Sequence, residues 1–244
     1  MGLLSRVGIG SATVDTILER DAVQPGDSID ARIEIEGGSD DQEVEELELA
    51  VATAYQVPDG DDDVSYHTAE ISEMELTDGF TIAAGEERTM DVPPIEIPVT
   101  TPATIDQTQV WVQTGLEIDW SVDPTDEDHL QVEPGPYLDA LLEAIEDLGF
   151  RFEMADNVRS SFGPHEFVQF FEYEEYGGTP WNGLDDIEFF LSPAADHLDV
   201  MVDVEASGVS LFGSDEQRAR FSVTSTDPSA VESTVRSVID GNLD

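Results

Sequence analysis

Short segments that alternate apolar and charged residues place the strongest constraint on the fold of this chain. In residues 29–36, apolar side chains occupy every second position and charged side chains mostly fill the positions between them. Successive side chains of a strand point to opposite faces of a sheet, so this spacing predicts a strand with one buried face. Similar patterns return in residues 47–55 and 110–120, with Pro and Gly turn signals between them. Many short strands of this kind predict an antiparallel β-sandwich over residues 1–124.

The second half of the chain, residues 125–244, combines strands with two predicted helices. Apolar residues recur at helical spacing after Pro136, and Gly149 supplies a C-terminal stop. A second helix is expected after Asp227 and Pro228, which read as an N-cap and a first helical position. We therefore expect a mainly β protein with two sandwich lobes, 1–124 and 125–244. The second lobe is expected to carry helices near 136–149 and 228–241.

The charge of the chain predicts adaptation to a salt-rich environment. The sequence has 56 acidic residues against nine basic ones, a net charge of −47, and all nine basic residues are arginine. At molar ionic strength the Debye length falls to about 3 Å, so neighbouring carboxylates repel one another weakly while their hydration keeps the protein dissolved. Disorder is the competing interpretation of such a charge. The hydrophobic content of 39% and the regular strand patterns favour a folded, halophilic protein.

Composition also excludes several classes of partner and chemistry. Nucleic acid and anionic lipid would be repelled by this charge, and no basic stripe offsets it. The chain has no cysteine, which excludes disulfides and thiolate chemistry. It also lacks an apolar stretch long enough for a signal peptide or a membrane span, so we expect a cytoplasmic location without membrane insertion.

Several motifs spread along the chain resemble the sporulation-control proteins of bacilli and their archaeal relatives. The stretches that carry the resemblance are 7–16, 24–27, 95–98, 110–118, 122–126, 148–150 and 167–170. The run Val110-Trp-Val-Gln-Thr-Gly-Leu-Glu-Ile118 is the most specific of them. With its charge, the chain is identified as a halophilic archaeal member. The resemblance implies an arrestin-like fold of two lobes and a non-catalytic adaptor or regulator that acts through protein–protein interaction. It supplies no catalytic residue, and the absence of lysine departs from the family's usual composition.

One loop has the ligand spacing of a calcium-binding loop. Asp59, Asp61, Asp63 and Glu70 fall at positions 1, 3, 5 and 12 of an EF-hand count. Position 6 should be Gly for the sharp turn, but it is Val64, and the flanking segments read as strands. We therefore expect a solvated hairpin loop and no bound metal, with these four residues as weak candidates.

An aromatic loop offers candidate contacts for a protein partner. Tyr173, Tyr176 and Trp181 lie close together in the sequence, and large aromatic side chains carry much of the binding energy at interfaces. The alternative is that Trp181 at least folds back onto the core, and we favour this alternative.

Catalytic constellations are missing from the sequence. The segment Gly208–Gly213 has the wrong spacing for a nucleophile elbow, and without lysine no Schiff base or Walker-type loop forms. The histidines, at 67, 129, 165 and 197, form no zinc-binding pair. We expect no catalytic residue, no cofactor and no enzymatic activity. Two other functions remain open: an enzyme with a carboxylate-held metal, and an assembly protein that forms homo-oligomers through its sheet edges.

Overall fold

The computed structural model describes residues 11–59, 64–77, 79–118, 123–176, 179–181, 184–206, 209–210 and 218–243. The chain divides into two compact units that are each discontinuous in sequence. Unit 1 comprises Met1–Thr53, Glu70–Pro98 and Gln109–Val132, and unit 2 comprises Ala54–Ala69, Val99–Thr108 and Glu133–Asp244. The expected lobe boundary at 124/125 falls just before a strand that pairs within unit 1, and two excursions from the first half belong to unit 2.

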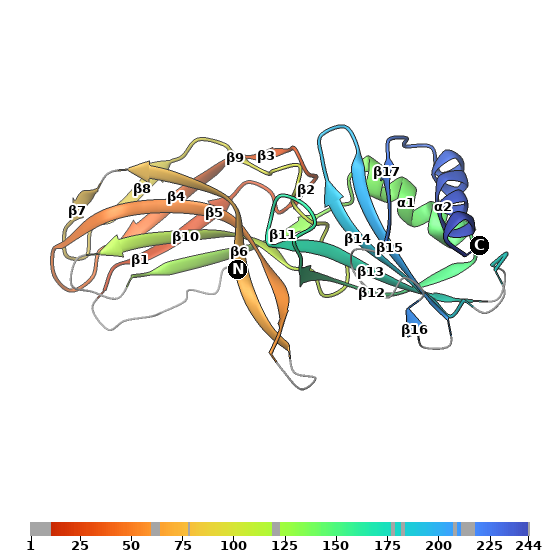
Figure 1. The fold of residues 1–244 in the computed structure, drawn as a ribbon. Coiled ribbons are helices and arrows are strands. Elements are labelled where there is room, and N and C mark those ends of the chain that lie inside the picture. Colours follow the sequence, from red (N-terminus) through yellow and green to blue (C-terminus); the bar gives the residue numbers. More distant parts are fainter. Residues whose placement is uncertain are drawn as a thin grey trace. The chain divides into compact units, whose positions relative to one another are not determined.

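Unit 1 is built from strands that enclose an apolar core. Its strands are β1 (Thr13–Leu18), β2 (Ala22–Val23), β3 (Ser28–Ile29), β4 (Ala31–Glu36), β7 (Phe80–Ile82), β8 (Glu87–Asp91), β9 (Ile95–Glu96), β10 (Val110–Ile118) and β11 (Thr125–Val132). One sheet has the order β1-β4-β8, and β10 pairs antiparallel with β11 on one side and with β5 (Gln42–Pro58) on the other (Figure 1). Ile33 and Ile35 of β4 pack in the same core as Leu47 and Leu49 of β5, with all four almost fully buried.

Two long strands contribute to both units. β5 pairs with β10 as far as Thr53, and beyond that point Gln56 pairs with Val158 of β12. β5 thus begins in unit 1 and ends in unit 2, whereas β6 (Val64–Thr77), which pairs with β5, begins in unit 2 and ends in unit 1.

Unit 2 is an antiparallel sheet with two helices packed on one of its faces. Its further elements are α1 (Pro136–Asp147), β12 (Phe150–Arg159), β13 (Phe167–Glu175), β14 (Asp186–Pro193), β15 (Leu198–Ala206), β16 (Val209–Ser210), β17 (Ala219–Val223) and α2 (Pro228–Leu243). Neighbouring strands from β12 to β15 pair in sequence order, and β17 pairs with β15. The mainly β architecture with two helices is confirmed.

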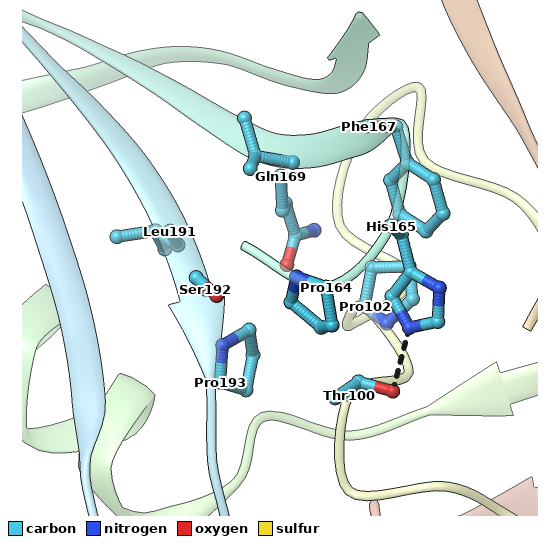
Figure 2. Close-up of a pocket in the computed structure, with 10 residues that line it drawn as sticks. Thr100, Pro102, Pro164, His165, Phe167, Gln169, Leu191, Ser192 and Pro193 are labelled. Carbon is cyan, nitrogen blue, oxygen red and sulfur yellow. Dashed lines mark hydrogen bonds between the residues drawn. The ribbon is translucent and has the colours of Figure 1, made fainter. Parts of the chain in front are cut away.

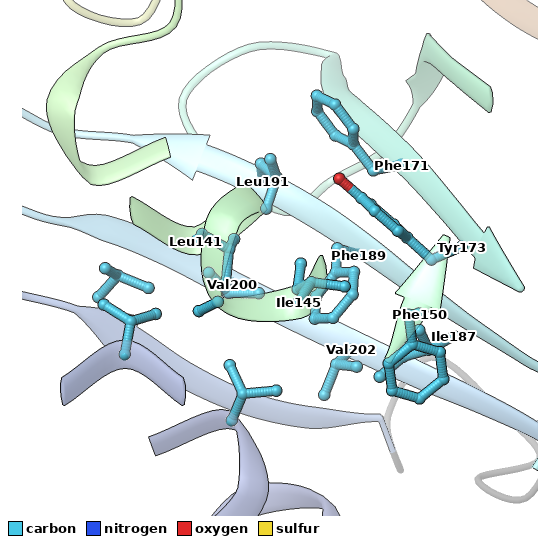
Figure 3. Packing of buried hydrophobic residues seen from close by; sticks show 14 of the residues in the cluster. Leu141, Ile145, Phe150, Phe171, Tyr173, Ile187, Phe189, Leu191, Val200 and Val202 are labelled. Atoms are coloured by element: carbon cyan, nitrogen blue, oxygen red, sulfur yellow. The ribbon is translucent and has the colours of Figure 1, made fainter. Parts of the chain in front are cut away.

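The helices bury the apolar stripes that the sequence predicted for them. Leu141 and Ile145 of α1 point toward Phe189 and Val200 on the sheet (Figure 3), and all four are at most 1% exposed. Pro136 begins α1, and Gly149, with φ of 94°, follows its C-terminal turn. The opposite face of the sheet carries a smaller cluster, with buried Val168, Phe170, Phe190 and Met201. Neither α1 nor α2 offers the apolar length that a membrane span requires.

Candidate binding site

The acidic residues proposed as weak metal candidates form no metal centre among the described residues. Asp59 and Glu70 are exposed, whereas Asp61 and Asp63 lie outside the described residues. Across the described ranges, no three His, Asp or Glu side chains gather as metal ligands would. The segment Gly208–Gly213, considered as a nucleophile elbow, lies largely outside the described residues, with Val209 and Ser210 in β16.

The three aromatic residues of the predicted loop occupy different environments. Tyr173 is 1% exposed and packs edge-on against Phe189, so it belongs to the core of unit 2 and offers no surface to a partner. The prediction is wrong for Tyr173, because the strand is covered by α1 on the face to which this side chain points. Burial, followed by the charge of Glu146, raises the pKa of Tyr173.

Trp181 is partly buried and Tyr176 is exposed. The Trp181 ring stacks on Phe150 at 6.1 Å, and its Nε1–H donates a 2.6 Å hydrogen bond to Asp240 Oδ1. This placement agrees with the favoured alternative, in which Trp181 packs on its own unit. Tyr176 is 66% exposed and lies against the Arg151 guanidinium, 4.4 Å from Cζ to the ring centre. Of the three, Tyr176 alone presents a largely exposed ring.

A pocket without acidic or arginine side chains lies in unit 2 beside the start of β13. We name it the His165 pocket; its lining residues are Thr100, Pro102, Pro164, His165, Phe167, Val168, Gln169, Leu191, Ser192 and Pro193. Nearly one residue in four of the chain is acidic, yet none of these ten is acidic or basic apart from the histidine. The pocket holds about 10 Å³, room for about one water, so it is a shallow surface feature.

Hydrogen bonds of His165 and Gln169 fix the walls of this pocket. His165 Nε2 lies 2.9 Å from Thr100 Oγ1 (Figure 2), and burial lowers the pKa of His165, so the ring is neutral near pH 7. The Gln169 side chain is buried and forms two hydrogen bonds with the backbone of Ala103, as a neighbouring strand would. Its Nε2 donates to the Ala103 carbonyl at 2.6 Å, and its Oε1 accepts from the Ala103 amide at 3.2 Å. These bonds attach the segment around Thr100 to β13.

Four aromatic rings continue from the pocket as one array, which we call the ring array. His67 lies 5.9 Å from Tyr55, Tyr55 lies 6.0 Å from Phe167, and Phe167 lies 5.4 Å from His165, measured between ring centres. These separations are those of favourable aromatic pairs. Tyr55 and Phe167 are 4% exposed, His67 is exposed and His165 is half-buried, so both ends of the array reach the surface.

The carboxylate of Glu166 lies beside Tyr55 of the ring array. Burial, followed by a hydrogen bond to Glu166, raises the pKa of the Tyr55 hydroxyl, so Tyr55 stays a neutral donor. The ring array and the His165 pocket thus form an aromatic surface whose pocket is lined by no acidic or arginine side chain, while Glu166 and Arg159 are the charged groups near Tyr55.

The sequence contained weak signals for this surface. Residues 98–105 hold no charged side chain, and Gly163-Pro164 precedes His165 as a turn signal. The histidine spacing concerns His165 and His67 only as possible metal ligands, and Thr100 and Gln169 belong to no motif. Their convergence depends on pairing between segments about 60 residues apart or more, which local patterns do not encode.

Comparison with known proteins agrees with this architecture. The family described as "SpoOM protein" matches residues 1–208. The chain is 34% identical over 213 residues to the sporulation-control protein spo0M of Bacillus subtilis, covering 86% of this chain and 82% of that protein.

A solved structure supports the same assignment. The crystal structure of Spo0M from Bacillus subtilis superposes with a TM-score of 0.83 at 32% identity, covering 96% of this chain and all of the other. Its fold is arrestin-like, so the expected arrestin-like fold is confirmed. The chain therefore belongs to the SpoOM family of sporulation-control proteins.

Proposed function

We propose that this chain is a non-catalytic cytoplasmic adaptor of its family, and that it binds a protein partner through the ring array and the His165 pocket. The observation that carries the proposal is the lining of the His165 pocket, which has no acidic or arginine side chain in a chain of net charge −47. The buried centre of a protein interface is depleted in charge and enriched in aromatic residues. A partner segment of neutral, apolar character fits this surface best.

The size of the described pockets supports binding over catalysis. The His165 pocket holds about 10 Å³, and two other pockets hold about 180 Å³ each. Sites that enclose a small-molecule substrate usually measure about 300–1,000 Å³. A shallow surface with aromatic ends suits a polypeptide that lies across it.

Affinity purification with charge-insertion variants tests the proposal. His67→Glu places a carboxylate at the exposed end of the ring array, and Ser237→Glu places one on the exposed side of α2 as the matched control. Tyr176→Glu tests the other exposed aromatic surface of unit 2. Each protein serves as bait in an extract of the source cells at molar KCl, and captured proteins are quantified by mass spectrometry.

We expect a partner that the parent protein and Ser237→Glu capture equally and His67→Glu captures at least about tenfold less, a loss of about 1.4 kcal/mol. If only Tyr176→Glu reduces capture of the partner, the interface lies at the aromatic loop around Tyr176 and not at the ring array. Equal capture by all four proteins, together with turnover in a hydrolase screen, would contradict the adaptor proposal.

A further inference from the structure

Three of the nine arginines of the chain surround one pocket of unit 2. Arg159 ends β12, Arg220 lies in β17, and Arg218 directly precedes β17. The pocket has a volume of about 180 Å³ and is also lined by Ser160 and Ser161. We call it the arginine pocket. No carboxylate belongs to its described lining, although the chain has six acidic residues for every basic one.

The floor of the arginine pocket is apolar and orients two guanidinium groups. Phe190 and Met201 are buried there, and Arg218 Cζ lies 4.4 Å from the centre of the Phe190 ring. Arg220 Cζ lies 5.4 Å from the centre of the Phe162 ring. A guanidinium that stacks on a ring keeps its N–H donors at its edge, since all five lie in its plane. The edge of the Arg220 guanidinium is therefore suited to bind an anion.

The described lining of the pocket carries a surplus of positive charge. Arg218 Nε forms a 3.0 Å ion pair with Asp203 Oδ2, and Asp203 is 3% exposed. Within the described residues, no carboxylate oxygen lies within 4.0 Å of a guanidinium nitrogen of Arg159 or Arg220. Arg159 and Arg220 therefore contribute two positive charges to the described lining of the pocket.

We propose that the arginine pocket binds a phosphoryl group. At pH 7 a phosphate monoester carries about −1.5 to −2 charges, which matches this surplus better than the single charge of a carboxylate. Arginine forks bind phosphate oxygens in pairs, and the hydroxyls of Ser160 and Ser161 add donors for the remaining oxygens. The phosphoryl group is either inorganic phosphate or part of a phosphorylated side chain. The lining of the arginine pocket shares no residue with the His165 pocket or the ring array, so each proposal can fail without the other.

Isothermal titration calorimetry with inorganic phosphate and with phosphoserine tests the site. The experiment uses the full chain at molar KCl and the variants Arg159→Gln and Arg220→Gln, neither of which leaves a described carboxylate without its ion pair. Arg236→Gln is the matched control, because it makes the same charge change on α2, where Arg236 pairs with Glu232. Arg220→Lys keeps the charge and removes the fork. Circular dichroism checks that each variant is folded.

We expect the parent protein to bind one phosphate per chain. Arg159→Gln and Arg220→Gln should each bind phosphate at least about tenfold more weakly, and Arg220→Lys should lose part of the affinity. Arg236→Gln should change the affinity by less than about twofold. Tighter binding of phosphoserine than of phosphate would assign the site to a phosphorylated side chain, and equal binding would assign it to the free ion. Binding of neither probe, or the same loss with Arg236→Gln as with Arg220→Gln, would overturn the proposal.

Discussion

The Tyr66 hydroxyl donates a 2.6 Å hydrogen bond to Oδ2 of Asp156, a carboxylate that is 1% exposed. Gln56 Nε2 donates to the same oxygen at 2.7 Å, and the Asn157 amide donates to Oδ1 at 2.7 Å. A buried carboxylate is tolerated when donors satisfy its oxygens. These bonds attach the parts of β5 and β6 that belong to unit 2 to strand β12.

Removal of the Tyr66 hydroxyl should therefore destabilise the protein. We expect Tyr66→Phe to lower the free energy of unfolding by about 1 to 2 kcal/mol, since Asp156 loses a donor where water has little access. Tyr176→Phe is the matched control, because both tyrosines are more than half exposed and the Tyr176 hydroxyl has no hydrogen-bond partner among the described residues. Urea denaturation of both variants measures the difference. Equal stability of the two variants would show that the Tyr66 bond contributes nothing.

Asp128 of β11 should make the stability of the protein depend on pH. Burial, followed by the charges of Asp126 and Asp15, raises the pKa of Asp128 to about 7. Folding thus favours the protonated carboxyl, so the contribution of Asp128 is most favourable below its unfolded pKa near 3.8. That contribution is lost as the pH rises through the folded value near 7.

Asp128→Asn removes this titration. We expect the variant to be more stable than the parent at about pH 8, with the difference shrinking toward about pH 4. Glu127→Gln, at the exposed neighbouring position, controls for the loss of one negative charge. Denaturation curves across this range provide the measurement. A stability difference that is the same at every pH would exclude the raised pKa.

Gly163 shapes the turn that precedes His165, and a side chain there should be poorly tolerated. Its φ is 107°, and an added Cβ would lie 2.6 Å from Ser192 Oγ, a residue of the His165 pocket. We expect Gly163→Ala to destabilise the protein by about 1 to 3 kcal/mol.

Gly241 of α2 is the matched control for Gly163→Ala. A Cβ at Gly241 meets no atom within 4 Å, so Gly241→Ala should be neutral or stabilise by up to about 1 kcal/mol. A midpoint of thermal unfolding that falls with Gly163→Ala and stays the same or rises with Gly241→Ala would support this role of Gly163. A harmless Gly163→Ala would show that the turn adapts.

Periodicity in the sequence was sufficient to predict most elements of the fold. Ile33 and Ile35 are buried while Glu34 and Glu36 are exposed, as alternation requires. The second helix begins at Pro228, and Asp227 Oδ1 accepts the Ser229 amide as an N-cap does. Such features are local, so residue spacing and cap chemistry determine them.

Features that depend on distant contacts were not predictable. Alternation did not reveal that β5 continues from one unit into the other, because both parts of the strand have similar apolar patterns. The sequence alone predicts an accessible Tyr173, since only the packing of α1 shows that its face of β13 is covered. The ring array joins residues 55 and 67 to 165 and 167, and no local motif links these positions.

The excess of carboxylates should make the fold depend on salt. Dilution from molar KCl to about 0.1 M lengthens the Debye length to about 10 Å, so repulsion among 56 acidic residues grows. We expect the midpoint of thermal unfolding to fall markedly over this range, as followed by circular dichroism. An unchanged midpoint would refute the prediction of a halophilic protein.

Site-specific photocrosslinking is the most direct test of the central claim, that the ring array and the His165 pocket bind a protein partner. A photoreactive phenylalanine derivative replaces His67 at the end of the ring array or, as a control, Ser237 on α2, and both proteins are irradiated in source cells. We predict one dominant crosslinked protein from position 67 and none from position 237. Crosslinks of equal yield and identity from both positions, or none from position 67, would contradict the claim.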